Sequence, residues 1–544
     1  STPDDDPATS EGLYVYTRSA PTVAVGDAVS VAGTVGEFRP GGASGNDNLT
    51  TTQITGPTVT VTGSGQTVPE PVVLGVDRVA PAQNVKTGDP GNVEREGVPF
   101  SPATDALDFY ESLEGMRTAV RDAVAVGPTN TSYGELPVVP GQQVDATRSR
   151  AGGVVYGGYD QPNTQRIILD DPLLPRDSMP RANVGDVLPG ESVGVLDYSF
   201  ANFKLLLTQV PGYRSSGLQR EVTAAPDKQQ LAVATLNVEN LDPSDPATKF
   251  SRLATQVTTN LRSPDVLALE EIQDNSGPAD DGVVASNKTT DKLIAAIRAA
   301  GGPAYEARSI DPQDKMDGGQ PGGNIRQVFL YRTDRGVSFV DRPGGDATTA
   351  TQVVGSGPRT TLSASPGRIE PTDSAWTDSR KPLVGEFRFK NQSYFVIANH
   401  FASKGGDDPL FGRWQQPTRF SESQRNAQAR VVRGFVDKLL AADPRANVVV
   451  LGDLNDFEFS RTTDILVGSG DTQLTALART LPANDRYTYV FDGNSQVLDQ
   501  TLISPALAKA PGNSKPRYEY DIVHTNSDFW DQDSDHDPQV VRLR

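Results

Sequence analysis

Long apolar runs in the C-terminal half of the chain end in chemically capable residues. They read LAVATLN, VLALEE, SYFVIANH and NVVVLGDLN, and they end on Asn237, on Glu270 and Glu271, on His400, and on Asp453 and Asn455. Each run is long and apolar enough for a strand buried on both faces. A polar end on such a strand is costly unless it meets a partner, a metal or a ligand. Together the runs predict one edge where carboxylate, amide and imidazole groups converge.

Helical periods separate these runs. One places Phe250, Leu253, Ala254, Val257 and Leu261 on one stripe, and another places Ala427, Val431, Phe435 and Leu439 on one stripe. Strands that alternate with helices are typical of an α/β layered domain. We place this domain at residues 226–544. Arg425, on the second helix, could turn toward the site, although a helix-surface ion pair is the default expectation.

The first 225 residues have a different texture. Short runs rich in Val and Thr are separated by Gly, Pro and Asp, which is typical of small antiparallel barrels or sandwiches. We predict a flexible tail at 1–10, an OB-like β-barrel at 11–85, a second β-rich domain at 86–211 and a linker at 212–225. The aromatic rings of Tyr14, Tyr16 and Phe38 are expected to pack in the barrel core, although OB barrels also bind single strands through aromatic and basic residues such as Arg39.

The composition of the chain limits the classes of function that it can have. A chain of 544 residues with a net charge of −19 has no long-range attraction for a polyanion, so an enzyme acting on nucleic acid would carry its positive charge locally as bound cations. The absence of cysteine excludes disulfides and thiolate metal sites. No apolar run reaches the length of a membrane span. The abrupt start, STPDDDPATS, leads us to expect a mature product whose signal peptide has been removed.

The C-terminal stretch DFWDQDSDHDPQVV adds another cluster, with Asp535 beside His536. The chain has only 3 histidines, and two of them, His400 and His536, fall in this constellation. His524 follows YEYDIV and is expected to be a satisfied core or surface residue with no catalytic role.

An ordered set of motifs points to a known family. TLNVEN, ALEEIQD, SRKPLVGEF, ANHF, VVLGDLND, LDQTLIS and SDHDP occur in that order over about 231–544. Each is short, but the ordered set is specific, and it resembles the endonuclease/exonuclease/phosphatase (DNase I-like) superfamily. NHFASKGGDDPLFG and the β-rich first half look most like the large secreted multi-domain nucleases of bacteria. The resemblance implies a four-layered α/β sandwich and a secreted, metal-dependent phosphodiesterase. Its substrate would be nucleic acid, DNA more than RNA, and we expect a monomer.

The resemblance also implies a metal centre. Asn237, Glu271 and Asp535 would hold Mg²⁺ or Mn²⁺, or Ca²⁺, because hard cations prefer oxygen ligands. Glu270 would point to the opposite side of its strand. Glu239 stands where some relatives have a metal-binding aspartate, and its longer side chain argues against that role.

The remaining roles follow from the same resemblance. His536 would contact the scissile phosphate, and Asp499 would fix its tautomer. Asp453 would position or deprotonate the attacking water, with Asn455 donating to the phosphate. His400 would donate to a phosphate oxygen or protonate the leaving group. Phosphate would also be bound by Arg380 and Lys404. The identity of the general base stays open.

Two alternatives stay open as well. The same residue set cleaves phospholipids, inositol phosphates or other small phosphate esters in related enzymes, and the acidity of the chain suits those substrates. A β-domain adhesion or scaffold protein with a degenerate catalytic fold is the second alternative. The complete set of motif residues argues against it, because a decayed site should have lost some of them.

Overall fold

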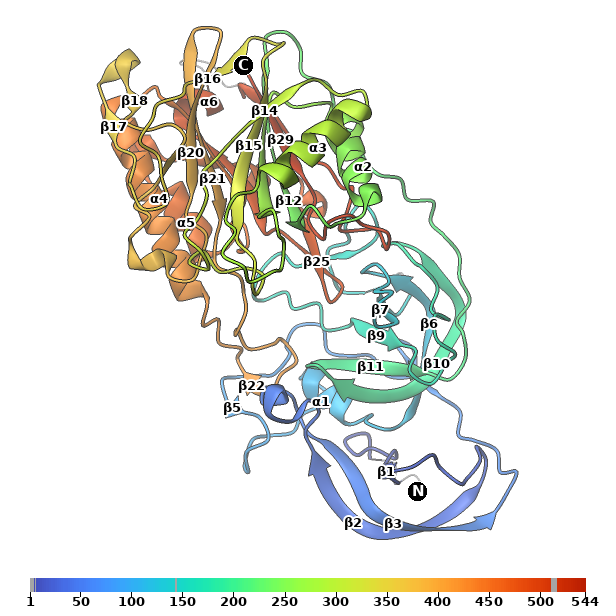
Figure 1. Cartoon of the computed structure of the whole chain (residues 1–544). Coiled ribbons are helices and arrows are strands. Elements are labelled where there is room, and N and C mark those ends of the chain that lie inside the picture. The colour runs from blue at the N-terminus through green and yellow to red at the C-terminus, as the bar shows by residue number, and fades with distance from the viewer. Residues whose placement is uncertain (1–3, 5, 142–143, 510–515) are drawn as a thin grey trace. The chain divides into compact units, whose positions relative to one another are not determined.

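The computed structural model describes residues 4, 6–141, 144–509 and 516–544. These residues form two compact units (Figure 1). Unit 1 comprises Ser1–Leu218 together with Gly406–Phe420 and Phe491–Ser495. Unit 2 comprises Gln219–Gly405, Ser421–Val490 and Gln496–Arg544. None of the helices in the described ranges combines the length and apolarity that a bilayer crossing requires.

Unit 2 is built on two mixed sheets. The first has the order β14-β15-β13-β12-β29-β28. Its strands are β12 (Leu231–Leu241), β13 (Val266–Gln273), β14 (Tyr305–Ser309), β15 (Ile325–Arg332), β28 (Tyr518–Ile522) and β29 (Gln539–Leu543). The second has the order β16-β20-β21-β23-β27-β24, with β19 beside β20. Its strands are β16 (Val337–Phe339), β19 (Gly367–Arg368), β20 (Leu383–Phe389), β21 (Gln392–His400), β23 (Asn447–Asp453), β24 (Thr475–Ala476) and β27 (Asp499–Ile503).

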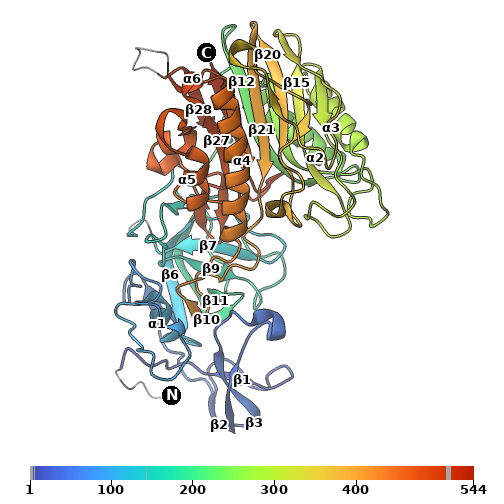
Figure 2. The same ribbon diagram turned by 90° about the vertical axis from the view of Figure 1, so that its left-hand side faces the viewer.

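Helices cover the outer faces of both sheets. Figure 2 shows the layers of unit 2 in turn, from α4 and α5 through the sheets to α2 and α3. The helices are α2 (Ala247–Thr255), α3 (Asn287–Ala299), α4 (Glu422–Ala442), α5 (Arg461–Val467) and α6 (Pro505–Ala508). A one-turn π-helical segment, Gln256–Asn260, extends α2, and a small hairpin pairs β17 (Val353–Val354) with β18 (Thr361–Leu362).

Three apolar cores hold these layers together. One lies between the sheets and includes Val233, Phe329 and Val449. The others lie under α2 and α3 and under α4 and α5. Both faces of each sheet are covered, so a strand can be apolar along nearly its whole length. The strand β23 is an example, because it is buried from its second residue onward. The expected α/β class is confirmed for this unit.

Of the four residues predicted for the core face of α4, Phe435 and Leu439 are buried, and in the first half of the helix the face is displaced by one position. The buried residues include Ala429, Val432, Phe435, Val436 and Leu439, whereas Ala427 and Val431 are only partly buried. The sequence stripe follows every fourth residue, and a real helix turns slightly more per residue. The buried stripe therefore drifts away from a strict four-residue repeat.

Unit 1 contains a closed barrel of five strands. They are β6 (Arg117–Ala125), β7 (Glu135–Val139), β9 (Ile167–Asp170), β10 (Val187–Ser199) and β11 (Asn202–Leu207). Their order is β10-β11-β9-β7-β6, and pairing of β10 with β6 closes the ring. The short strand β4 (Val72–Leu74) runs parallel to β6, and the helix α1 (Ala106–Glu111) precedes the barrel.

The barrel expected at 11–85 is wrong. In that range β1 (Tyr14–Tyr16), β2 (Ala28–Phe38) and β3 (Thr51–Gly63) form an open three-stranded sheet, whereas β4 pairs with β6 of the later barrel. The rings of Tyr14, Tyr16 and Phe38 are 58%, 43% and 50% exposed, so they do not pack in a core. Three strands are too few to curl into a closed ring, and the aromatic side chains stay on an uncovered face.

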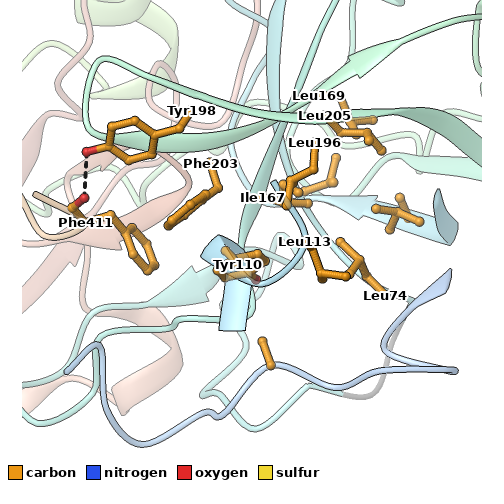
Figure 3. Close-up of a cluster of buried hydrophobic side chains, with 14 of the residues drawn as sticks. Leu74, Tyr110, Leu113, Ile167, Leu169, Leu196, Tyr198, Phe203, Leu205 and Phe411 are labelled. Atoms are coloured by element: carbon orange, nitrogen blue, oxygen red, sulfur yellow. Dashed lines mark hydrogen bonds between the residues drawn. The ribbon is translucent and has the colours of Figure 1, made fainter. Parts of the chain in front are cut away.

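The core of unit 1 includes a segment from the far half of the sequence. Figure 3 shows Phe411 beside Tyr110, Tyr198 and Phe203, with the Tyr198 hydroxyl donating to the Phe411 carbonyl at 2.8 Å. Two strand pairs also join segments that are far apart in the sequence. They are β22 (Trp414–Gln415) with β5 (Gly91–Asn92), and β26 (Asn494–Gln496) with β8 (Val154–Val155). The remaining strand, β25 (Tyr489–Phe491), belongs to the β25-β26-β8 sheet. The sequence pattern assigns both inserted segments to 226–544, because a loop that folds with another unit leaves no local signal.

Candidate active site

Two β-bulges shape the ends of the central strands in the first sheet. The register of β12 against β13 shifts between Asn237 and Leu241, and that of β13 against β15 shifts between Leu269 and Ile272. Glu239 and Glu271 adopt left-handed backbone conformations there, with φ of 50° and 63°. Non-glycine residues take up this conformation only where the surroundings hold them, and such positions cluster at functional sites. The bulges therefore aim side chains out of the regular alternation of the sheet.

Asn237, Glu271 and Asp453 meet where the two sheets end. Asn237 Nδ2 donates to Glu271 Oε1 at 3.0 Å and lies 3.3 Å from Asp453 Oδ2. The Asn240 amide donates to the other oxygen of Glu271 at 2.9 Å. Glu271 belongs to the first sheet and Asp453 ends β23 in the second, so the site spans both sheets.

The two neighbouring glutamates have different surroundings. Glu270 is fully buried and accepts a hydrogen bond from Thr235 Oγ1 at 2.8 Å, and burial raises its pKa well above the ordinary value. Glu239 lies in the bulge, and its amide donates to Asn237 Oδ1 at 2.9 Å; burial, then the nearby charge of Asp535, raises the pKa of its carboxyl to about 7. The structure thus separates Glu271 from Glu270 as predicted, although the pair lies in a β-bulge rather than in a regularly alternating strand.

His400 ends β21 and lies beside both carboxylates. Its Nε2 is 3.6 Å from Glu271 Oε1 and 3.6 Å from Asp453 Oδ2. Burial, with smaller contributions from Arg380 and His536, lowers the pKa of His400 well below the usual value, so its imidazole is neutral at pH 7. Arg380 is itself buried, donates to the Phe401 carbonyl, and has its pKa lowered by burial.

His536 is held by Asp499. His536 Nδ1 lies 2.7 Å from Asp499 Oδ2, and its Nε2 is 3.9 Å from Asp453 Oδ2 and 3.8 Å from Asp535 Oδ1. Burial opposes the charged form, but Asp499, then Asp453 and Asp535, raise the pKa of His536 well above its usual value. One nitrogen is thus anchored and the other faces the carboxylates, as an orienting Asp–His pair requires. The Tyr489 ring lies 4.9 Å from the imidazole.

The turn after β23 fixes Asp453. The Asn455 amide donates to Asp453 Oδ1 at 2.8 Å, and Asn455 Nδ2 donates to the Phe401 carbonyl at 3.1 Å. Asn455 also has a left-handed backbone, with φ of 48°. Burial raises the pKa of Asp453 to about 6, although His536 works in the opposite direction. A carboxylate with this pKa is charged at pH 7 and can accept a proton.

A known protein family matches most of the sequence that forms this site. Residues 360–535 match the family described as Endonuclease/Exonuclease/phosphatase. The C-terminal part is an endonuclease/exonuclease/phosphatase domain. With its carboxylate- and histidine-lined site, the protein is a metal-dependent phosphoesterase of that type. Residues 73–215 match a family described as a domain of unknown function, DUF8508. No curated protein matches the chain in sequence.

Several solved structures resemble the chain. A humanized D. rerio TDP2 is 17% identical, with 58% of this chain and 99% of that chain covered and a TM-score of 0.35. The human Nocturnin catalytic domain with bound sulfate is 12% identical over 59% of this chain and 96% of that chain, with a TM-score of 0.36. An endonuclease/exonuclease/phosphatase from Bacteroides vulgatus is 13% identical over 58% and 98%, with a TM-score of 0.34.

The side chains of the endonuclease/exonuclease/phosphatase domain fit a divalent cation. Two groups bring ligand atoms within 4.8 Å of one another: Glu271, His400 and Asp453, and Asp453, Asp499 and His536. The donors are mainly carboxylate oxygens, which suit hard cations better than thiophilic ones. Of the ligands expected from the sequence, Glu271 belongs to the first group, Asn237 contacts it, and Asp535 lies beside His536.

Asp456, next to Asn455 in the sequence, forms ion pairs with two basic residues. Lys404 Nζ is 3.0 Å from Asp456 Oδ1 and lies 4.1 Å from the centre of the Phe457 ring. Arg425 Nε donates to Asp456 Oδ2 at 3.0 Å, and Arg425 is completely buried. The surface ion pair expected for Arg425 is wrong, because the side chain turns inward from α4. It also donates to the Ser403 carbonyl at 3.2 Å, in the segment that follows His400.

Sequence reasoning missed one aromatic residue of the site region. Tyr489, which packs on His536, has no motif signal. His524, expected to be a satisfied core or surface residue, is buried, and its Nδ1 lies 3.0 Å from Asp537 Oδ2. The only sequence signal for His524 was its rarity, as one of 3 histidines in the chain.

Proposed function

We propose that this phosphoesterase is an extracellular nuclease that hydrolyses phosphodiester bonds in nucleic acid, DNA in preference to RNA. The observation that carries the proposal is the His536–Asp499 pair, 2.7 Å apart, facing the buried carboxylate of Asp453. A phosphodiester is anionic and resists attack by water, so its cleavage needs a proton acceptor and a group that stabilises developing negative charge. The pair and Asp453 supply both kinds of group.

The charge of the site explains the need for a cation. The carboxylates of Glu271, Asp453, Asp499 and Asp535 lie at the site, where His536 and Arg380 supply the positive charge. An anionic substrate would be repelled unless a divalent cation offset the carboxylates. Mg²⁺ or Mn²⁺, or alternatively Ca²⁺, is the proposed cofactor, and when bound it would neutralise charge on the phosphate. Glu271 and Asn237, with Asp535, are the proposed ligands.

Each remaining side chain then has a proposed task. Asp453, charged at pH 7, positions the attacking water and accepts its proton. His536 is cationic at that pH and stabilises negative charge on the phosphate. Neutral His400 donates to a phosphate oxygen or to the leaving oxygen, and Arg380 and Lys404 attract the phosphate.

Features of unit 1 support a polymeric nucleic-acid substrate. We propose that its five-stranded barrel is OB-like, a fold whose loops bind oligonucleotides. Tyr133 is 72% exposed in the β6–β7 loop, and Phe200 is 77% exposed at the β10–β11 turn. Lys204 Nζ lies 5.2 Å from the centre of the Phe200 ring and pairs with Glu135. Exposed rings suit base stacking, which is worth about 1–3 kcal/mol per base.

The extracellular location rests on the motif resemblance to large secreted nucleases. It is tested by separating culture medium from cells of the source organism and probing both fractions with an antibody against this protein. Detection in the medium before cell lysis supports secretion. Confinement to the cell fraction contradicts it.

A substrate panel tests the function itself. The protein is incubated with plasmid DNA, RNA, sphingomyelin and bis(p-nitrophenyl) phosphate, each with Mg²⁺ and with EDTA. The Asp499→Asn variant serves as the matched inactive control, because it keeps the side-chain volume and removes the charge that orients His536. Metal-dependent cleavage of plasmid DNA supports the proposal. Cleavage of sphingomyelin but of neither nucleic acid would favour the lipid alternative, and no cleavage of any substrate would favour the non-catalytic one.

The aromatic residues of the barrel can be tested separately. A Tyr133→Ala, Phe200→Ala double variant should raise KM for plasmid DNA about fivefold or more, since base stacking is lost. Hydrolysis of bis(p-nitrophenyl) phosphate should not change. An unchanged KM for DNA would contradict the proposed role of the barrel.

A further inference from the structure

A second histidine–aspartate pair lies behind the catalytic one. His524, Asp485, Tyr487, Asp528 and Asp537 form a buried group that we name the His524 cluster. His524 Nδ1 is 3.0 Å from Asp537 Oδ2, and its Nε2 is 3.6 Å from Asp485 Oδ1. The imidazole stacks on the Tyr487 ring at 4.0 Å with an angle of 10°, and the Tyr487 hydroxyl donates to Asp528 at 2.8 Å.

Asp537 links this cluster to the backbone of His536. Its Oδ1 accepts the amides of Thr525, Asn526 and Ser527 at 2.9, 2.7 and 3.0 Å. These hydrogen bonds hold residues 525–527 in a turn. In this turn Asn526 Nδ2 donates to the His536 carbonyl at 2.7 Å. Asp537 is also the residue that directly follows His536. The hydrogen bond from His524 therefore completes a set of donors that fixes the chain beside the catalytic imidazole.

A second route from the cluster leads to Asp499. Tyr487, stacked on His524, is followed by Thr488, whose carbonyl accepts the amide of Asp537 at 2.7 Å. The Thr488 hydroxyl accepts the amide of Asp499 at 3.1 Å. The next residue, Tyr489, pairs with His536 through a β-bridge. The same short segment thus contacts both members of the catalytic pair.

We propose that His524 and Asp537 form a positioning pair that fixes His536 and Asp499 in their catalytic geometry without touching the substrate. The 2.7 Å contact between His536 and Asp499 demands accurate placement of both backbones. Misplacement of about 1 Å at a catalytic group can lower a rate about 100-fold. Groups that orient catalytic or metal-binding side chains commonly contribute about 10- to 100-fold to activity.

Two substitutions separate the hydrogen bond from the ring. His524→Phe keeps a ring against Tyr487 and removes the nitrogen that meets Asp537. His524→Asn removes the ring and keeps a donor toward Asp537. For each, kcat and KM are measured on bis(p-nitrophenyl) phosphate at saturating Mg²⁺, together with Tm. A small diester is used so that the result does not depend on whether the natural substrate is nucleic acid.

His524→Phe should lower kcat by about 10- to 100-fold while KM changes by less than about threefold. His524→Asn should restore kcat to within about fivefold of the wild type. Leu293→Ala, in the core under α3, is the control for lost stability: it should lower Tm and leave kcat unchanged. A lower Tm with unchanged kcat in folded His524→Phe would reduce His524 to a structural residue and overturn the proposal.

A milder variant decides the question if His524→Phe does not fold. Ser527→Ala removes only the hydroxyl that donates to Asp537 Oδ2. The proposal expects kcat to fall about threefold or more, since Asp537 loses one of the donors that hold it. An unchanged kcat in Ser527→Ala would overturn the proposal.

Discussion

Substitution of a buried glutamate should stabilise the protein in a pH-dependent way. Glu458 is only 5% exposed, and its Oε2 has no hydrogen-bond partner within the described ranges. Burial raises its pKa from 4.5 to about 7, although Arg486 and Arg479 act in the opposite direction. The folded protein therefore holds a proton on Glu458 at pH values where the unfolded chain has released it.

The sign and size of the effect follow from this difference. Below about pH 4.5 the side chain is protonated in both states, and it has no pH-dependent effect on stability. As pH rises from 4.5 to about 7, the unfolded state gains stability by releasing the proton. Above both values the free energy of unfolding is lower by about 3 kcal/mol. Glu458→Gln, which carries no charge at any pH, should avoid this loss.

The assay compares urea unfolding of the wild type and Glu458→Gln between pH 4.5 and pH 8 in EDTA. The two free energies of unfolding should agree near pH 4.5 and diverge by about 3 kcal/mol at pH 8, with the variant more stable. Glu96→Gln, at an exposed position, is the matched control and should show no divergence. A constant difference between the wild type and Glu458→Gln across this range would refute the reasoning.

Two further predictions concern catalysis and the division of the chain. His536→Ala should lower kcat on bis(p-nitrophenyl) phosphate by about 100- to 10,000-fold with an unchanged circular dichroism spectrum, and a loss below tenfold would count against its role. A fragment that begins at Thr223 should be insoluble or unfold at a lower temperature, because Phe411 and the rest of 406–420 lose their packing partners in unit 1. A soluble fragment with unchanged Tm and unchanged kinetics on both DNA and the small diester would contradict that expectation.

The sequence predicted much of the site because strand ends are local signals. His400 and Asp453 stand at the last positions of β21 and β23, where their apolar runs place them. The bulges were not predictable, since Glu239 and Glu271 adopt left-handed conformations without the glycine that marks such positions. Alternation with a period of two carries no information about where a strand inserts an extra residue.

Long-range pairing explains the other differences. Closure of the barrel in unit 1 depends on pairing between β6 and β10, and the sequence of neither strand indicates which strand it pairs with. Phe411 reads as a loop residue of the catalytic domain, although it packs in the core of unit 1. Likewise, the proposed positioning role of His524 depends on its contact with Asp537, which is 13 residues away and belongs to another motif. Local patterns identify elements, whereas these outcomes depend on which elements meet.

Metal dependence is the most direct test of the central claim. The protein is freed of metal with EDTA, dialysed, and assayed on plasmid DNA and bis(p-nitrophenyl) phosphate before and after addition of Mg²⁺, Mn²⁺ or Ca²⁺. Because carboxylates of Glu271, Asp453 and Asp499 dominate the site, we expect the metal-free protein to be inactive. At least one of these cations should restore activity, and Glu271→Gln should require a higher metal concentration. Full activity after exhaustive chelation would contradict the account.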